Sequence, residues 1–195
     1  MHESCFNIFT RRTRGRAAIG QPTFRQLQFE RGKNLNLVMA IASGIGVVYF
    51  ELQRGTMTKD RYQHFLDNLE HVLISSGAAM PQVTVVMDNA PVHNGAACED
   101  AEVKYLPPYS PFLNPVENCF SVFKLKLREV LREEIVVDRI ADVPVGISAA
   151  EHRLQVLHCE STKILEDMET ISGAKKSYHY VWPCNDIHAS LFHTK

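Results

Sequence analysis

Hydrophobic and polar positions along the chain predict a series of strands. The mostly apolar run 35–43 predicts a buried strand. The run 47–52, rich in β-branched and aromatic residues, predicts its hairpin partner across the turn residues of 43–46. A short apolar, β-branched run at 83–87 predicts a buried strand, and 103–106 is another short strand candidate. Together with the helices expected between and after them, these strands indicate an α/β fold with helices packed on a sheet.

Helical spacing of apolar residues marks the other elements. One amphipathic helix is expected to follow Thr58, a candidate N-cap, and to end near Ser75-Ser76-Gly77. A late helix is expected over about 148–171, after a connector at 138–146. The tail 175–195 has no clear pattern.

The segment Asn114-Pro115-Val116-Glu117 is typical of a helix start. Asn114 is expected to cap the helix and Pro115 to take its first position. Glu117 stands where a capping-box acid would stand. The stripe from Val116 to Leu131 then predicts a helix with one apolar face.

Composition narrows the class of protein. The 195 residues suffice for one domain with a hydrophobic core, and 45% hydrophobic with 22% charged residues is ordinary for a globular chain. No apolar run approaches the ~20 residues of a membrane helix, and no secretory signal is visible. Five scattered cysteines suit free thiols in a reducing compartment, so we expect an intracellular protein.

The net charge of −1 gives no argument for nucleic acid, which must rest on local patches. Four arginines form the first patch: Arg11, Arg12, Arg14 and Arg16. They form either a solvated surface loop or a set of phosphate contacts. The polar side of the helix after Pro115 carries the second patch: Lys124, Lys126, Arg128 and Arg132.

Two acids stand out by position. Asp88 ends a predicted buried strand, and Glu117 lies in the first turn of a predicted helix. Such positions often line one edge of a sheet, where paired carboxylates hold Mg²⁺. The alternative is structural, because Asp88 suits a turn and Glu117 suits a cap. Spacing alone therefore does not establish a metal site.

Two segments together resemble a known family. They are Asp88-Asn89-Ala90-Pro91-Val92-His93-Asn94 and the run from Leu106-Pro107-Pro108-Tyr109 through Asn114-Pro115-Val116-Glu117. Both resemble the core signature of mariner-superfamily DDE transposases and their bacterial insertion-sequence relatives. The resemblance extends from Glu3 to about Leu131. It implies an RNase H-like mixed sheet flanked by helices, in which three acids bind two Mg²⁺ or Mn²⁺ ions and cleave and join DNA strands.

The resemblance assigns roles to individual residues. Asp88 matches the second acid and Glu117 the third, which makes both expected catalytic metal ligands. His93 matches a loop histidine that either helps position the site or packs on the sheet edge. The first acid's position holds His2, and imidazole suits Zn²⁺ or Mn²⁺ better than Mg²⁺. Glu3 is expected to point to the opposite face of the strand.

Little chain precedes His2, so we expect the first central strand to be largely missing and sheet edges to be exposed. We also expect no N-terminal helix-turn-helix region to read DNA sequence. The predicted organisation is a catalytic domain over 1–135 and a helical extension and tail over 136–195.

Two hypotheses of function remain open at this stage. In the first, the chain is a transposase-derived DDE endonuclease that contacts mainly the DNA backbone. The expected DNA-binding residues are Arg11, Arg12, Arg14, Arg16, Lys124 and Arg128. In the second, His2 marks a non-catalytic remnant that serves as a DNA-binding or protein-interaction module. No membrane or small-molecule cofactor is expected. A homodimer stays open, as does a nucleus or a bacterial cytoplasm as the compartment.

Overall fold

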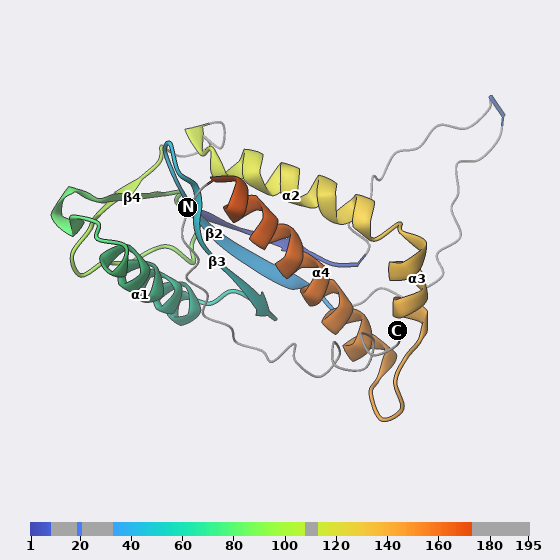
Figure 1. Cartoon of the computed structure of the whole chain (residues 1–195). Coiled ribbons are helices and arrows are strands. Elements are labelled where there is room, and N and C mark those ends of the chain that lie inside the picture. The colour runs from blue at the N-terminus through green and yellow to red at the C-terminus, as the bar shows by residue number, and fades with distance from the viewer. Residues whose placement is uncertain (9–18, 21–32, 108–112, 173–195) are drawn as a thin grey trace.

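The computed structural model describes residues 1–8, 19–20, 33–107 and 113–172. The predicted arginine patch at 11–16 and the tail at 175–195 lie outside these residues. Within the described residues, the sequence folds into two small sheets and four α-helices, with one 3₁₀ turn (Figure 1).

Three antiparallel strands form the larger sheet, in the order β1-β2-β3, and two parallel strands form the smaller one. The strands are β1 His2–Phe6, β2 Leu35–Ala42, β3 Gly46–Arg54, β4 Thr84–Met87 and β5 Glu102–Tyr105. The first strand is therefore short rather than absent, and all five of its residues pair with β2. The Met1 amino group donates a hydrogen bond to the Val86 carbonyl at 2.6 Å, which connects the start of β1 to β4.

The predicted helices are present, and the structure adds one more. The helices are α1 Lys59–Ser75, the 3₁₀ turn η1 Met80–Gln82, α2 Val116–Val130, α3 Glu134–Ala141 and α4 Ala149–Ser172. The prediction of a connector over 138–146 is wrong for its first part, because α3 continues to Ala141. Val136 and Ile140 lie one turn apart on α3 and are each 3% exposed, so burial of this face stabilises the short helix.

The two predicted helix starts differ. At α1, the Thr58 hydroxyl accepts a hydrogen bond from the Arg61 N–H at 3.3 Å, which confirms the predicted cap. At α2, Pro115 has helical angles as expected, but no side chain caps this end. The predicted Asn114 cap and Glu117 capping box are therefore wrong. The Glu117 carboxylate instead contacts His2.

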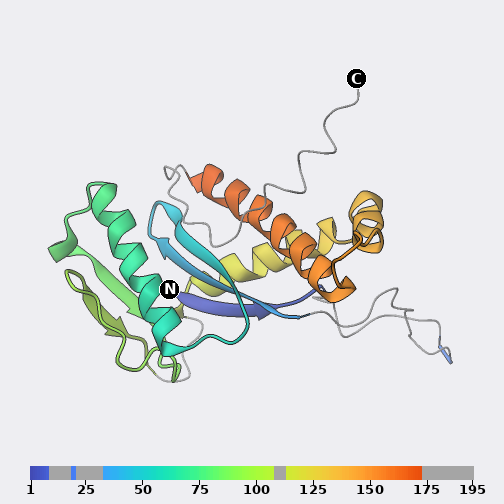
Figure 2. The ribbon, with the colours of Figure 1, turned by 90° about the horizontal axis from the view of Figure 1, so that it is seen from below.

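Strand β2 separates two apolar layers. Leu37 and Met39 pack with α2, α3 and α4, whereas Val38 and Ala40 pack with α1 and β4. This alternation follows from the pleat, which turns successive side chains to opposite faces. Figure 2 shows the resulting arrangement, with α1 on one side of the sheet and α2 and α4 on the other. Both faces are covered, so the larger sheet lies at the centre of the molecule.

Helix α4 shares the core of the larger sheet. Leu157 and Leu165 on α4 are at most 1% exposed and belong to the same apolar cluster as β2 and α2. The predicted domain limit at residue 135 stays a prediction. Across the described part of the chain, no helix is both long and apolar enough to span a bilayer.

Candidate active site

His2 lies at the start of β1, between two carboxylates that come from distant parts of the chain. Its Nδ1 is 3.4 Å from Asp88 Oδ2, and its Nε2 is 3.1 Å from Glu117 Oε1. Asp88 directly follows β4, and Glu117 lies in the first turn of α2. The structure thus brings the two sequence-predicted acids to one imidazole at the edge of the sheets. Their role as metal ligands stays a prediction.

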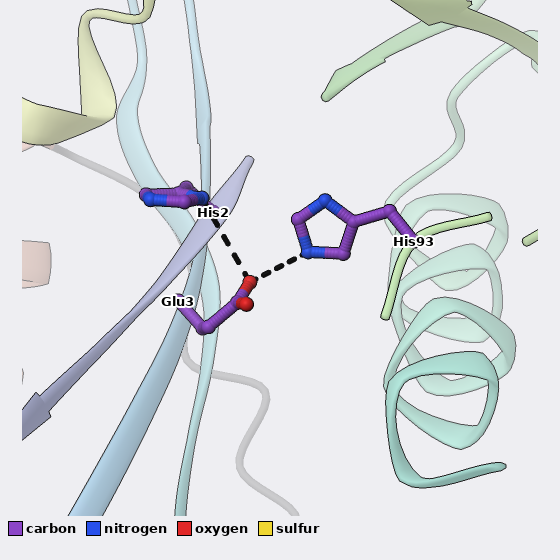
Figure 3. A group of neighbouring side chains, drawn as sticks. All are labelled: His2, Glu3 and His93. Carbon is purple, nitrogen blue, oxygen red and sulfur yellow. Dashed lines mark hydrogen bonds and ion pairs between the residues drawn. The ribbon is translucent and has the colours of Figure 1, made fainter. Parts of the chain in front are cut away.

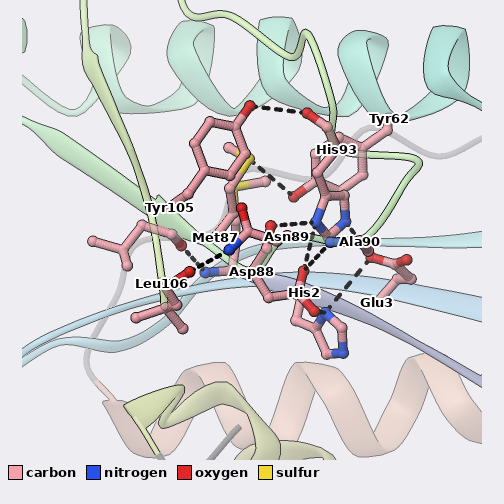
Figure 4. A network of polar contacts seen from close by, with 12 residues as sticks. His2, Glu3, Tyr62, Met87, Asp88, Asn89, Ala90, His93, Tyr105 and Leu106 are labelled. Atoms are coloured by element: carbon pink, nitrogen blue, oxygen red, sulfur yellow. Dashed lines mark hydrogen bonds and ion pairs between the residues drawn. The ribbon is translucent and has the colours of Figure 1, made fainter. Parts of the chain in front are cut away.

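His93 is fully buried and held from several sides (Figure 4). Its ring stacks on Tyr62 of α1 with centroids 4.0 Å apart. Its Nδ1 lies 2.6 Å from Asp88 Oδ1, and its backbone carbonyl accepts a hydrogen bond from the Tyr105 hydroxyl at 3.0 Å. The ring orientation is therefore fixed by packing and by polar contacts together.

Glu3 also reaches this cluster, contrary to expectation. Its Oε2 lies 2.6 Å from His93 Nε2 and 3.8 Å from His2 Nδ1 (Figure 3). The strand alternation itself holds, since His2 packs beside Phe120 of α2 while Glu3 turns towards His93. The glutamate side chain is long enough to bring its carboxylate back towards His2 at the strand end.

The carboxylates of Glu3 and Asp88 also shift the pKa of His93. Burial alone would lower the pKa of His93, but the hydrogen bond to Glu3 and the negative charges of Glu3 and Asp88 outweigh it and raise that pKa. Burial, followed by the same two charges, raises the pKa of Tyr62. The cluster therefore favours a protonated His93 beside a neutral Tyr62 hydroxyl.

A groove of about 920 Å³ opens beside the cluster. Its lining includes His2, Glu3, Arg54, Val92 and Leu154. The groove gives a small ion or water a route to the side chains of His2 and Glu3, which are 20% and 19% exposed. His93 is 0% exposed and does not line the groove.

The predicted DNA-binding residues are only partly visible. Lys124 and Arg128 lie half-buried on α2, and the Arg128 Nε donates to the Lys124 carbonyl at 3.0 Å. The four arginines of the first patch lie outside the described residues. Sequence reasoning missed Tyr62 as a site residue. It lies on the predicted buried face of α1, and no local signal distinguishes a core tyrosine from one that stacks on a site histidine.

The covered sheet, together with acids at the end of β4 and the start of α2, defines an α/β fold of the RNase H-like kind. Residues 1–135 match the model of the DDE superfamily endonucleases. The chain therefore belongs to the DDE superfamily endonuclease family.

One solved structure, the first named here, supports this assignment of fold. The Mos1 mariner paired-end complex with Mn aligns with a TM-score of 0.50 and 24% identity, covering 90% of this chain and 55% of that chain. The Mos1 transposase paired-end complex with left transposon end gives 0.49 and 24%, over 88% and 54%. The chain thus spans about half the length of these proteins. No match is found among curated proteins. The predicted membership of the DDE superfamily endonucleases and the predicted RNase H-like fold are confirmed.

Proposed function

We propose that this chain is the metal-dependent DNA-cleaving and strand-joining domain of a mariner-like transposase. One observation carries the proposal: the start of β1, the end of β4 and the first turn of α2 meet at His2, Asp88 and Glu117. These are the three positions at which the family resemblance places the metal-binding acids. A folded chain that keeps these three positions together keeps the framework of the reaction.

The donor set favours Mn²⁺ over Mg²⁺. Asp88 and Glu117 supply carboxylate oxygens, which suit either ion, whereas His2 supplies imidazole nitrogen, which suits Mg²⁺ poorly. The Asp88 side chain is 35% exposed and the Glu117 side chain 43%, which leaves room for water and a phosphate at the same edge. A bound divalent ion would activate a water and stabilise the leaving oxygen of a phosphodiester.

Helix α2 would stabilise the Glu117 carboxylate and contact the DNA. The N-terminus of α2 carries a partial positive charge, which stabilises the Glu117 carboxylate and favours a nearby phosphate. Lys124 and Arg128, further along α2, would contact the DNA backbone. The relevant Mos1 complex is described as a paired-end complex, and by analogy we propose transposon-like DNA ends as the substrate.

A second candidate is a non-catalytic DNA-binding or protein-interaction module. It is favoured by the position of His2, whose two ring nitrogens each face one of the carboxylates. His2 thus bridges the two acids without any metal. This candidate predicts a folded chain that binds DNA but does not cut it.

Nicking of supercoiled plasmid DNA separates the two candidates. We expect the wild-type chain to nick DNA with Mn²⁺ and to do so far more slowly with Mg²⁺. Asp88→Asn and Glu117→Gln each remove a carboxylate with little change of shape, so each should reduce nicking to background. Glu129→Gln, an exposed acid on the same helix, is the matched control and should nick like wild type.

His2→Asp supplies a third carboxylate at the same position, and it should raise nicking with Mg²⁺ relative to wild type. Nicking that survives both Asp88→Asn and Glu117→Gln would contradict the proposed site. A folded wild-type chain that binds DNA and nicks with neither ion would leave the non-catalytic module as the function.

A further inference from the structure

We infer that His2, Glu3 and His93 form a second binding site, which shares His2 with the proposed catalytic site, for one transition-metal ion of the Zn²⁺ or Co²⁺ class. This site goes beyond the proposed function, because none of its three ligands is an acid of the family signature and only His2 stands at one of the signature positions. Among the described residues, these three are the one group of metal-ligating side chains whose donor atoms all lie within 4.8 Å of one another. Figure 3 shows the three side chains converging from β1 and from the loop after β4.

The donor atoms are arranged for a single ion. Glu3 Oε2 lies 2.6 Å from His93 Nε2 and 3.8 Å from His2 Nδ1. Donors that each lie about 2.0–2.2 Å from one ion are themselves about 3–4 Å apart. The Glu3–His2 distance fits this range, and the Glu3–His93 pair must open slightly. His2 Nδ1 is buried and makes no hydrogen bond among the described residues, although Asp88 Oδ2 lies 3.4 Å away. A metal ion would satisfy this nitrogen and displace the proton shared by Glu3 and His93.

In each histidine, the ring nitrogen that does not face Glu3 lies near another carboxylate. His2 Nε2 is 3.1 Å from Glu117 Oε1, and His93 Nδ1 is 2.6 Å from Asp88 Oδ1. Metal-binding histidines usually donate their second N–H to a carboxylate in this way, which fixes the tautomer and raises ligand basicity. The remaining ring nitrogens, His2 Nδ1 and His93 Nε2, both lie near Glu3 Oε2, and Asp88 Oδ2 is also 3.4 Å from His2 Nδ1. Asp88 and Glu117 would here orient the ligands rather than bind the ion.

The ligand chemistry selects the class of metal. Two imidazoles and one carboxylate suit Zn²⁺, Co²⁺ or Fe²⁺ and do not suit Mg²⁺. Stacking on Tyr62 holds the His93 ring, so little ordering is needed when the ion binds. The groove beside His2 and Glu3 provides an entry path and an open coordination position for water.

Visible absorption of Co²⁺ tests the site without any assay of activity. The full chain, purified on a tag without histidine, is titrated with CoCl₂, and the d–d bands report ligand binding. We expect wild type to bind one Co²⁺, and Zn²⁺ to abolish the bands by displacement. Glu3→Gln and His2→Ala change partly exposed ligands and should weaken binding at least tenfold. Asp88→Asn and Glu117→Gln should weaken it by about 10–100-fold without abolishing it.

His64→Ala removes an exposed histidine of α1 and serves as the control, with unchanged binding expected. Glu3→Gln that binds Co²⁺ as tightly as wild type would overturn the inference, and so would a wild-type chain that is folded by circular dichroism yet binds no Co²⁺. Loss of binding in Asp88→Asn and Glu117→Gln with full binding in Glu3→Gln would assign the ion to the carboxylate pair instead. Co²⁺ binding without DNA nicking would defeat the proposed function alone.

Discussion

Glu70 is a buried carboxylate that orders part of the loop between β4 and β5. Its side chain lies on α1 and is shielded from solvent, since the residue is only 7% exposed. It accepts hydrogen bonds from the backbone N–H groups of Glu99 at 3.0 Å and Asp100 at 3.1 Å. The same loop carries His93 at its beginning. Glu70 therefore fixes the far end of a segment whose near end belongs to the site.

We expect Glu70→Ala to lower the free energy of unfolding by about 1–3 kcal/mol, because two backbone donors lose a charged acceptor. Urea denaturation followed by circular dichroism measures this. Asp67→Ala, on the exposed side of the same helix, should change stability by no more than about 0.5 kcal/mol. Equal losses in the two variants would mean that the Glu70 contacts add nothing.

Single residues also show what local sequence can and cannot predict. Asp88 and Glu117 were found from their places at a strand end and a helix start, and a family signature gave them roles. Glu3 and Tyr62 carry no such signal. Glu3 reaches the cluster through side-chain length at a strand end, and Tyr62 through the packing of α1 over a loop about 30 residues later. These are tertiary effects, which propensity and periodicity do not contain.

Helix α3 is joined to α4 by a buried ion pair. Arg139 Nη1 lies 2.6 Å from Glu160 Oε1, and Lys163 Nζ lies 2.9 Å from the same oxygen. Burial alone would raise the pKa of Glu160, but hydrogen bonds from Lys163 and Arg139 and their positive charges outweigh burial and lower it below the ordinary 4.5. Glu160 therefore binds its proton less readily in the folded chain than in the unfolded chain.

The direction of the pH effect follows from this shift. A lowered pKa in the folded state stabilises the protein above about pH 4.5, and that contribution is lost as the pH falls below this value. We expect Glu160→Gln to cost about 1–3 kcal/mol at pH 7, less than the roughly 3–5 kcal/mol of a fully buried pair, since Lys163 is largely solvated. The loss of unfolding free energy caused by Glu160→Gln should become smaller when urea denaturation is repeated at lower pH. A constant cost, like that of exposed Asp167→Asn, would contradict the role of the charge.

The elements differed in how well the sequence predicted them. The β2–β3 hairpin, α1 and α4 have long periodic patterns and were predicted nearly to the residue. Helix α3 was missed because eight residues give only two buried positions, too few for a period to be recognised. The start of α2 was placed correctly, but its cap was not, because the Glu117 side chain contacts β1 rather than its own helix.

At the scale of the whole molecule, charge is balanced overall but not locally. The net charge is −1, so any affinity for DNA must come from patches such as the Lys124 and Arg128 face of α2. The packing of helices on a sheet was predicted from the alternation of strands and helices. The pairing of the strands was not, since register and sheet order depend on contacts between distant segments.

If the α2 face contacts the DNA backbone, binding should weaken as the salt concentration rises. The slope of log K against log salt should then report the number of phosphate contacts. We expect the double variant Lys124→Gln/Arg128→Gln to bind duplex DNA more weakly and to lower the slope of log K against log salt by about 2. Fluorescence anisotropy over a salt series measures both. Lys59→Gln, an exposed lysine on α1, should leave the slope unchanged. An unchanged slope in the double variant would place the DNA elsewhere.

The contact between Glu3 and His93 joins residues 90 positions apart, and the contact between Met1 and Val86 joins residues 85 positions apart. Bringing such distant segments together requires the closure of long loops, which is entropically costly and slow compared with helix formation. A refolding chain would therefore acquire its helical signal before it could hold an ion between β1 and the loop after β4. Metal binding during refolding would therefore report when these distant segments have come together, rather than when the helices have formed.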